Sequence, residues 1–562
     1  MKGLLVVVLF AVVGARAQSP VPVAAPAAER PRLLVLCSVD QLAAWVFDAG
    51  LPHLAEHGGF RRLLRAGARF QHCEFEHACS ETGPGHATIG TGVAARVHGI
   101  ARNKWWVRET RLGIYCVDEP MPPLPEWPEG KNRGPGLLLA PTLATALKAG
   151  VPGSRVGSVS WKDRSAILMA GKQADLAVWC EASTGRFVTN TAWTKLAPAW
   201  LVAWNERNEL GALFGTVWER SGPESAYEGL VDDRPYELVH GNGKGMRTLP
   251  QALTGATTKA GPEFHAQVYA SPFGNSIVRS AAQAMVVGMQ LGADDVPDLL
   301  CVSFSSTDVV GHVFGPESVE ARDALLRLDH ELATFLTFLD AQVGKDKWAM
   351  FVTADHGVGM TPEWAKTKGL DAGRGAITTM VGVFAEKAVA EALGPPPAGR
   401  RFVSHVGEFS VYFDDEVLDA VRGERTLAEA RAAAAAAVVA VATKVRGVEV
   451  AYATADLLAP GGAPDALRRS LVDAIVPGRA GEVQFVVKAN WLDGTTPASH
   501  GTPHPYDRQV IGLAVGRGVP AGALLPDRFT PGFGVVWYAQ MLGLPRPAGA
   551  NDVVPASFGE RW

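Results

Sequence analysis

RLLVLCSVD, residues 32–40, is a continuous apolar run that ends in the carboxylate of Asp40. Such a run is typical of a strand buried in a parallel sheet, with a functional side chain at its carboxyl end. Two later stretches end their apolar runs in Asp or Asp-His in the same way: DLLCVSFSSTD (298–308) and KWAMFVTADH (347–356). Between them, residues 318–344 have apolar residues at helical spacing. Strand, helix and strand in this order predict an α/β fold with a doubly wound, mostly parallel sheet flanked by helices.

The main domain is predicted to span residues 31–545, followed by a C-terminal tail at 546–562. Two segments interrupt the alternation of strands and helices, and we expect both to be insertions that cap the sheet. The first, at about 113–296, is irregular and rich in Trp, Gly and Pro. The second, at about 373–490, contains an alanine run that favours a helix. RQVIGLAVG (508–516) then returns to the apolar character of a strand.

The N-terminus has the three parts of an export signal. A positive charge at Lys2, an apolar run at 3–13 and the small-residue motif ARA at 15–17 predict a signal peptide at 1–17. QSPVPVAAPAAER (18–30) is then a flexible tether. The apolar run is too short to span a bilayer, so we expect a periplasmic or secreted protein with no stable membrane association after cleavage. An uncleaved membrane anchor is the alternative.

Charge and cysteine content narrow the functional classes. The formal net charge is −4 over 562 residues, which gives no indication of a basic face for nucleic acid or an anionic membrane. Six cysteines fit an exported protein that forms disulfides, but none has the CxxC spacing of a zinc or redox motif. Cys37 and Cys301 lie in apolar runs and are expected in the core. The candidates for pairing are Cys73, Cys79, Cys116 and Cys180.

Carboxylates and imidazoles, which bind divalent metals, gather at the ends of the predicted strands. They are Asp40, Asp308, His312, Asp355, His356 and, in SHGTPH, His500. Any one of them alone is more often a helix cap or a hydrogen-bonded surface group. Together, three carboxylates and three imidazoles suffice for two neighbouring metal sites. The absence of cysteine from this set is typical of catalytic sites that keep an open position.

SETGPGHATIGTG (80–92) places Thr82 just ahead of a Gly-Pro-Gly turn and a short helix of small residues. Backbone N–H groups at a helix start attract phosphate and favour an ionised hydroxyl. In isolation, Thr82 would be an ordinary N-cap. Gly83, Pro84 and Gly85 favour an anion site instead, because they let a phosphate approach the backbone closely.

Two cations in VGSVSWKDRSAIL (156–168) suit a phosphate monoester. Lys162 and Arg164 stand two residues apart in an apolar-flanked strand, so their side chains would share one face and Asp163 would point to the other. A monoester dianion exposes three non-bridging oxygens, for which Arg164 offers a fork and Lys162 a point charge. The plainer alternative is an exposed edge strand with solvated charges.

These motifs, in this order and over residues 31–545, resemble the alkaline phosphatase superfamily, and within it the phosphate-irrepressible alkaline phosphatase type. The matching stretches are SVDQL at Asp40, ETGPGHATIGTG at Thr82, RNKWW at Asn103, SWKDRSAIL at Lys162 and Arg164, STDVVGH, TADHG and SHGTPHPYD. The resemblance implies hydrolysis of small-molecule phosphate monoesters by an enzyme that uses two zinc ions and a transiently phosphorylated threonine.

The resemblance also implies a role for each residue. One zinc ion would be bound by Asp308, His312 and His500. The other would be bound by Asp40, Asp355, His356 and the oxygen of Thr82. Thr82 would attack phosphorus, while the zinc on the far side would stabilise the leaving oxygen and then activate water. The non-bridging phosphate oxygens would be held by Asn103, Lys162 and Arg164.

Several neighbouring residues have open roles. His500 is favoured as the ligand over His504 because it holds the His-Gly position of the motif, and His504 is expected to line the cleft. His86 is expected to pack beneath the nucleophile. Trp105 and Trp106 either stack on an aromatic leaving group or pack as part of a lid.

Two other functions fit part of the pattern. A phosphodiesterase or nucleotide pyrophosphatase of the same superfamily also uses threonine and the same metal ligands. Lys162 and Arg164 disfavour it, because a diester carries less charge on the transferred group and needs room for its second substituent. A catalytically silent, metal-stabilised binding protein is the other alternative, which the complete set of ligands and the nucleophile disfavours.

Overall fold

The structure is a computed structural model that describes residues 30–239 and 247–559. The predicted signal peptide (1–17) and nearly all of the predicted tether (18–30) lie outside these residues, so both stay predictions. No helix in the described part of the chain combines the length and the apolar character needed to cross a bilayer.

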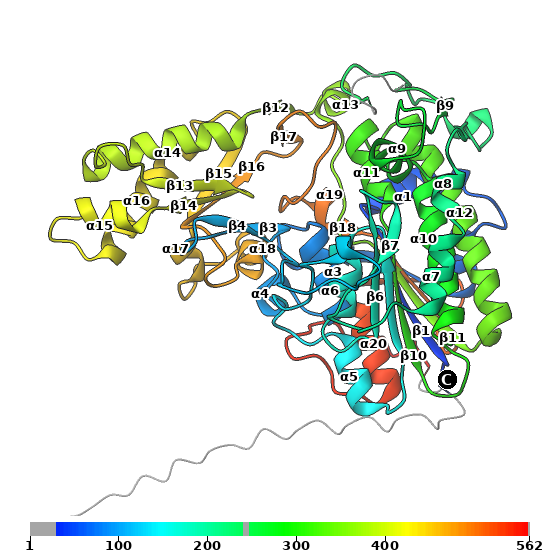
Figure 1. The fold of residues 1–562 in the computed structure, drawn as a ribbon. Coiled ribbons are helices and arrows are strands. Elements are labelled where there is room, and N and C mark those ends of the chain that lie inside the picture. Colours follow the sequence, from blue (N-terminus) through cyan, green and yellow to red (C-terminus); the bar gives the residue numbers. More distant parts are fainter. Residues whose placement is uncertain (1–29, 240–246, 560–562) are drawn as a thin grey trace, which may run out of the picture.

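Ten strands form one central sheet (Figure 1). They are β1 (Leu33–Val39), β2 (Ala68–Glu74), β5 (Val156–Ser160), β6 (Leu176–Glu181), β7 (Arg186–Val188), β10 (Asp298–Phe304), β11 (Trp348–Thr353), β18 (Gln509–Val510), β19 (Gly512–Val515) and β20 (Ala523–Phe529). Their order is β18-β2-β19-β11-β1-β10-β5-β6-β7, with β20 beside β2. From β11 to β6 the neighbours are parallel, and β1 is buried along its whole length. The predicted mostly parallel sheet is confirmed.

Helices pack on both faces of this sheet and in a second unit. Those of the body are α1 (Ala44–Gly50), α2 (Gly59–Ala66), α3 (Thr82–Thr91), α4 (Ala95–His98), α5 (Leu143–Gly150), α6 (Asp163–Ala170), α7 (Ala199–Glu206), α8 (Glu209–Ala212), α9 (Pro262–Tyr269), α10 (Phe273–Gly288), α11 (Ser306–Phe314), α12 (Val319–Leu339), α13 (Pro362–Thr367), α19 (Pro505–Arg508) and α20 (Phe533–Leu542). Those of the second unit are α14 (Ile377–Leu393), α15 (Asp415–Val421), α16 (Leu427–Ala442), α17 (Thr454–Leu458) and α18 (Ala466–Ala474).

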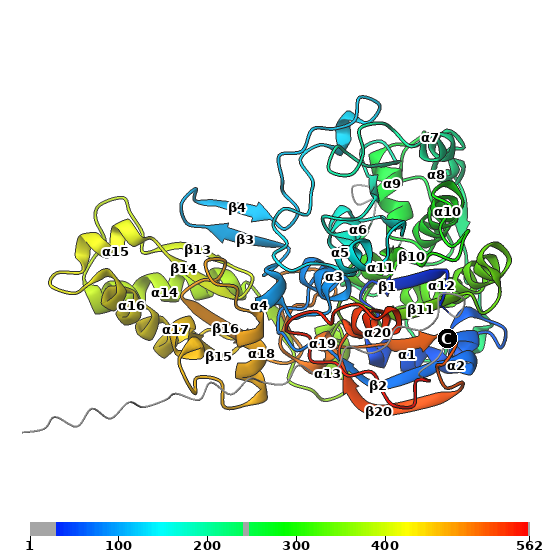
Figure 2. The same cartoon turned by 90° about the horizontal axis from the view of Figure 1, so that it is seen from below.

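Neighbouring residues of β5 show how the layers form, because successive side chains of a strand face opposite sides. A Cβ on Gly157 would lie 2.6 Å from the sulfur of Met285 in α10. The hydroxyl of Ser158 donates a hydrogen bond to the carbonyl of Ala166 in α6. Helices α10 and α6 therefore cover opposite faces. Helix α12 packs with α10, while α3 and α20 lie on the α6 side (Figure 2).

The second unit, which we define as residues 377–487, has its own antiparallel sheet and core (Figure 1). Its strands, in spatial order, are β13 (Val403–Gly407), β14 (Ser410–Phe413), β16 (Val483–Val487) and β15 (Val448–Ala453). The alanine run forms α16, which begins with a capping box between Thr426 and Glu429. The chain enters and leaves the unit through a short parallel pair, β12 (Gly373–Gly375) and β17 (Trp491–Asp493).

The expectation that residues 113–296 are an insertion throughout is wrong. This range supplies β5, β6 and β7 of the central sheet, together with the small pair β8 (Val217–Trp218) and β9 (Gln251–Ala252). Tryptophan, glycine and proline crowd the connections between these strands and hide their short apolar runs. A hairpin of β3 (Lys104–Val107) and β4 (Leu112–Tyr115) projects from the body beside the second unit (Figure 2).

All six cysteines are free and buried, so the structure does not contain the expected disulfide pairs. The segment 546–559 of the predicted tail packs on the body. Phe558 lies among the rings of Phe70, Phe533 and Trp537.

Candidate active site

The predicted site residues meet at one edge of the central sheet. Strands β10 and β11 flank β1 in parallel, and Val39 lies beside Phe304 while Ser38 lies beside Thr353. The three strands therefore end at the same level. Their carboxyl ends deliver Asp40 and the turns that carry the other ligands, which is where ligands bind in open α/β sheets.

Two ligand sets form at this edge, each with its ligand atoms within 4.8 Å of one another. The first contains Asp308, His312 and His500, and the second contains Asp40, Asp355 and His356. Asp308 and His312 are four residues apart on α11, which places them on one face of the helix. His500 comes from the distant C-terminal segment, and its ring stacks on that of His356 with 3.5 Å between centroids. Both predicted groupings are thus found in the structure.

The histidine rings are oriented for metal binding by backbone carbonyls. Nδ1 of His312 lies 2.9 Å from the carbonyl oxygen of Ala498, and Nδ1 of His500 lies 3.1 Å from that of Ser80. His356 makes the same contact with Gly357 at 3.0 Å. A carbonyl only accepts, so Nδ1 carries a proton in each ring and Nε2 is the nitrogen that would bind a metal.

The second set is short of partners for its buried polar atoms. Asp40 Oδ1, Asp355 Oδ2 and His356 Nε2 are buried and make ion-pair contacts of 3.2–3.5 Å with one another or with His86, but no hydrogen bond among the residues described. Burial, together with the neighbouring carboxylate of Asp355, raises the pKa of Asp40. Crowded carboxylates with unsatisfied oxygens fit a divalent cation, and the mixture of imidazole and carboxylate is one that zinc accepts.

Lys162 already supplies one positive charge to this cluster. Its ammonium donates to Asp40 and to Asp308, each at 2.6 Å, and so bridges the two ligand sets. Burial opposes its charge, but these two carboxylates raise the pKa of Lys162 above its usual value. The ammonium lies where the negative charge of both sets is concentrated.

Thr82 is the first residue of α3 and is buried at the centre of the site. Its hydroxyl oxygen accepts from Lys162 Nζ at 3.3 Å and from Arg164 Nη2 at 3.2 Å. The N-cap position belongs to Glu81, so Thr82 is not the helix cap considered above. The structure therefore brings the predicted nucleophile together with both predicted cations.

Lys162 and Arg164 both reach the Thr82 hydroxyl, as predicted, but the strand predicted to carry them is wrong. Strand β5 ends at Ser160, Lys162 is the N-cap of α6, and Arg164 lies in the first turn of that helix. Asp163 is not set apart on an opposite face, because it shares the Tyr115 hydroxyl with Arg164; it accepts from Tyr115 at 2.6 Å and from Arg133 at 2.7 Å. Arg164 in turn donates to the Tyr115 hydroxyl at 3.2 Å, which fixes one end of its guanidinium.

Asn103 is held by a network that the sequence did not reveal. Its Oδ1 accepts the backbone N–H of Gly83 at 2.7 Å, and its backbone N–H donates to Glu81 at 2.8 Å. Arg102 donates to the other oxygen of Glu81 at 3.1 Å. Because Oδ1 is already engaged, the amide group of Asn103 presents its NH₂ as the donor for a phosphate oxygen.

The glycines after Thr82 serve packing as well as access. A Cβ on Gly85 would lie 1.9 Å from the carbonyl oxygen of Asp355, so glycine lets α3 approach the end of β11. The backbone N–H of Gly83 donates to Asn103, so it is not free to donate to a phosphate. The backbone of this turn therefore contributes less to phosphate binding than the sequence predicts.

His86 and His504 belong to neither ligand set, although Nδ1 of His86 lies 3.2 Å from a carboxylate oxygen of Asp355. His86 contacts the Thr82 carbonyl and Ser303, both at 2.8 Å, and supports the first turn of α3 from below. His504 Nε2 lies 2.8 Å from the carbonyl of Val487 in the second unit. It belongs to neither ligand set.

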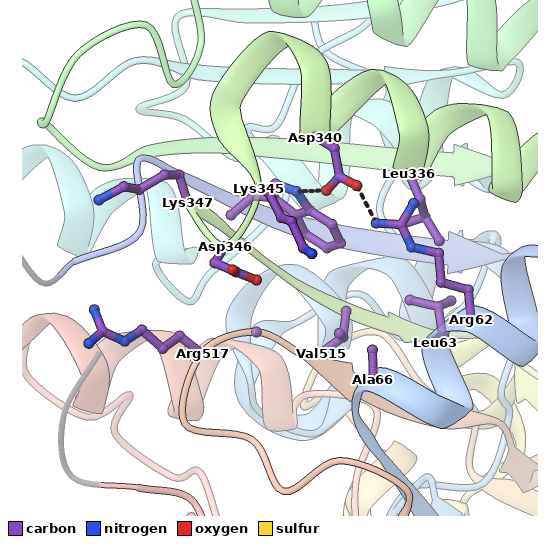
Figure 3. Close-up of a pocket in the computed structure, with 12 residues that line it drawn as sticks. Arg62, Leu63, Ala66, Leu336, Asp340, Lys345, Asp346, Lys347, Val515 and Arg517 are labelled. Carbon is purple, nitrogen blue, oxygen red and sulfur yellow. Dashed lines mark hydrogen bonds and ion pairs between the residues drawn. The ribbon is translucent and has the colours of Figure 1, made fainter.

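A separate pocket of about 500 Å³ lies at the opposite, amino end of β11 (Figure 3). Its lining includes Arg62, Asp340, Lys345 and Arg517, and Arg62 donates to Asp340 at 2.6 Å. None of the candidate site residues lines it. The chemistry therefore belongs to the carboxyl edge of the sheet, not to this pocket.

Comparison with known proteins agrees with this location. Residues 34–372 match the family model described as type I phosphodiesterase / nucleotide pyrophosphatase. The matched range contains every candidate site residue except His500.

Two alkaline phosphatases are similar to this protein over most of the chain. Alkaline phosphatase PafA of Elizabethkingia meningoseptica is 29% identical over 539 residues, covering 92% of this chain and 91% of that protein. Alkaline phosphatase PhoV of Synechococcus elongatus is 28% identical, covering 88% of this chain and 86% of the relative. A crystal structure of wild-type alkaline phosphatase PafA superposes with a TM-score of 0.84 at 27% identity, covering 93% of this chain and 98% of the other.

Proposed function

This chain belongs to the type I phosphodiesterase / nucleotide pyrophosphatase family, within the alkaline phosphatase superfamily, and on that premise we propose that it hydrolyses phosphate monoesters through a phosphothreonine at Thr82. One observation carries the proposal: the Thr82 hydroxyl lies within hydrogen-bond reach of both Lys162 and Arg164, beside two metal-ligand sets. Two cations around the nucleophile match the charge of a transferred monoester phosphoryl group.

The proposed reaction has two displacements. Thr82 Oγ1 forms a bond to phosphorus as the bond from phosphorus to the ester oxygen breaks, and the alcohol departs. Water then forms a bond to phosphorus as the bond to Thr82 Oγ1 breaks, which releases inorganic phosphate and restores the hydroxyl. Lys162, Arg164 and the NH₂ of Asn103 would hold the phosphoryl oxygens while charge is spread over them.

Zinc is the metal we propose for both ligand sets, one ion in each. When bound, the two ions would supply Lewis-acid stabilisation of the attacking and leaving oxygens. Backbone carbonyls fix the rings of His312, His356 and His500 through Nδ1. The carboxylates of the two ligand sets are buried beside these rings, so each set is arranged to bind an ion.

A diesterase is the second candidate, because the matching family model carries that name. The position of Lys162 favours the monoester. It places a full positive charge 3.3 Å from the nucleophile oxygen, in a buried site where an extra ester substituent would meet an ammonium. A diester monoanion needs less charge and more room.

A rate comparison tests this choice. We expect kcat/KM for 4-nitrophenyl phosphate to exceed that for bis(4-nitrophenyl) phosphate by several orders of magnitude. Replacing both Lys162 and Arg164 by alanine should lower the monoester value by about 10²- to 10³-fold or more, since loss of one well-placed donor costs about 3 kcal/mol. The diester value should fall far less. A ratio that stays the same in a folded, metal-loaded double variant contradicts the proposal and favours the diesterase.

We further propose export and a role in releasing phosphate from organic esters outside the cytoplasm. Support comes from the signal-like residues 1–17. Expression in a bacterial host should yield protein in the periplasmic or culture fraction with Gln18 as its first residue. Uncleaved protein confined to the cytoplasm would contradict this part of the proposal.

A further inference from the structure

We propose that Asp507 is a positioning residue of the active site: its side chain holds the loop that carries His500, and it thereby sets the affinity of the first ligand set for its metal ion. The inference rests on the proposed function, because it needs His500 to be a zinc ligand. No role was expected for this aspartate, which ends the SHGTPHPYD motif.

His500 is the one ligand of its set that lies outside a helix. Asp308 and His312 are both part of α11, whereas residues 494–504 form no helix or strand. The His500 ring contacts the Ser80 carbonyl through Nδ1 at 3.1 Å. A metal site tolerates only small shifts of its ligand atoms, so the backbone of this loop must be held as well.

Asp507 supplies that restraint by closing the loop after His500. Its Oδ2 accepts from the backbone N–H of Thr502 at 2.9 Å and from the Thr502 hydroxyl at 2.6 Å. Only Gly501 separates Thr502 from the ligand, and its φ of 95° lets the chain turn sharply there. Asp507 is fully buried, so water does not compete for these hydrogen bonds.

The backbone of Asp507 fastens the closed loop to the rest of the site. Its carbonyl oxygen accepts the N–H of Gly357 at 2.7 Å and the Ser80 hydroxyl at 2.9 Å. Gly357 directly follows the ligand His356, and Ser80 belongs to the segment that leads into α3. The Asp507 side chain therefore links the loop of His500 to a backbone point that two other parts of the site hold in place.

These contacts require an oxygen acceptor at position 507. Oδ1 of Asp507 is buried and has no hydrogen-bond partner in the described part of the chain, so the restraint comes from Oδ2. An asparagine side chain keeps one such oxygen, whereas alanine keeps none. Asp507→Asn should therefore preserve the loop, and Asp507→Ala should release it.

Zinc binding to the purified protein tests the inference. Metal-free protein is titrated with zinc in competition with a chromophoric chelator, and the parent should show two sites. Asp507→Ala should weaken one site about 10- to 100-fold, the usual effect of losing a residue that supports a metal ligand, and should leave the other within about threefold. Asp507→Asn should bind zinc like the parent. Thr502→Val removes only the hydroxyl contact and should weaken the same site less.

A second pair of variants tests whether Asp507 acts through His500. His500→Ala alone should weaken zinc binding at one site. In that background Asp507→Ala should lower zinc affinity by less than about twofold, because the ligand that it positions is already absent.

Asp552→Ala is the matched control. Asp552 is buried and accepts from the backbone N–H of Thr530 at 2.8 Å and from the Thr530 hydroxyl, so it makes the same pair of contacts in a loop that contains no candidate ligand. Its loss should lower the thermal midpoint and leave both zinc sites unchanged.

Parental zinc affinity in folded Asp507→Ala would overturn the inference, and Thr502→Val decides in the same way if Asp507→Ala does not fold. A further tenfold loss in the His500→Ala background would also overturn it, as would equal weakening in Asp552→Ala, because either result indicates a general loss of structure. Failure of the proposed function differs, since the parent itself would then bind fewer than two zinc ions or hydrolyse no monoester.

Discussion

Thr82 has two cationic neighbours as hydrogen-bond partners, at 3.2 and 3.3 Å from its oxygen. A threonine hydroxyl is a poor nucleophile until it is ionised, and nearby positive charge stabilises the ionised form. The dipole of α3, which begins at Thr82, acts in the same direction. Activation at this residue therefore comes from electrostatics, and a metal bound beside it would strengthen the effect.

Glu320 gives a prediction on stability at the residue scale. It is fully buried in the first turn of α12, and neither carboxylate oxygen has a hydrogen-bond partner in the described part of the chain. Burial, with a contribution from Asp232, raises the pKa of Glu320 to about 9. The folded state then binds the extra proton between the unfolded pKa of about 4.5 and the folded pKa, so stability falls as pH rises through this window.

Glu320→Gln should remove this pH dependence. Thermal unfolding should show the variant more stable than the parent at pH 8.5, by several kcal/mol, with the difference closing near pH 5. The exposed Glu228 offers a control, because Glu228→Gln should not change the pH profile. A parent profile that is flat between pH 5 and 8.5 would contradict the expected burial of charge at Glu320.

At the scale of elements, α3 depends on its approach to the end of β11. Gly85→Ala would place a methyl group 1.9 Å from the Asp355 carbonyl, which is backbone and cannot move aside cheaply. We expect α3 to shift, Thr82 to move relative to the second ligand set, and kcat/KM to fall at least about 100-fold, since small displacements of catalytic groups are costly.

Gly113→Ala is the control for this change, since nothing lies within 4 Å of a Cβ at that position in the β3–β4 hairpin. Its activity should match the parent. Full activity in Gly85→Ala, with metal content unchanged, would show that the helix tolerates displacement from β11.

The elements also explain what the sequence could predict. An apolar run followed by Asp is a local pattern, so β1, β10, β11 and the carboxylates after them could be located without a structure. For Lys162 and Arg164 the predicted proximity is observed, but the predicted local structure is wrong, because the apolar run of β5 continues in the sequence through Trp161. Asp163, an acidic residue in the first turn of α6, was the available signal of a helix start.

The supporting residues could not be predicted in the same way. Tyr115 meets Asp163 across 48 residues of chain, and Arg102 meets the Phe409 ring of the second unit across a still longer separation. Neither contact follows a local periodicity, and single tyrosines and arginines in irregular segments are common. Only the folded arrangement shows that they hold Arg164 and Asn103 in place.

At the scale of the whole molecule, several side-chain contacts hold the second unit against the body beside the candidate active site. Trp106 of the hairpin stacks on His405 with centroids 4.8 Å apart, and Arg108 pairs with Glu482 at 2.6 Å. Arg479 donates to the Gly99 carbonyl at 2.6 Å. Of the two roles considered for Trp106, the structure therefore shows packing between units. Asn103, at the base of this hairpin, is held by Gly83 and Glu81 of the body.

Metal content is a property of the assembled site, because its ligands come from three strand ends and the distant C-terminal segment. Treatment with a chelator should abolish monoester turnover, and zinc should restore it more fully than magnesium because three imidazoles are among the ligands. Metal content by mass spectrometry and the thermal midpoint should rise together with activity on reloading. Undiminished turnover in protein shown to be free of metal would rule out the proposed two-metal site.

The central claim, that Thr82 carries the phosphoryl group, is tested most directly by trapping the intermediate. The protein is mixed with 4-nitrophenyl phosphate, quenched in acid within milliseconds and digested, and the phosphorylated peptide is mapped by mass spectrometry. We predict a single substrate-dependent phosphate on Thr82, absent from Thr82→Ala and present, with turnover, in Thr82→Ser. A substrate-dependent phosphate on any other residue, or full turnover by Thr82→Ala, would contradict the account.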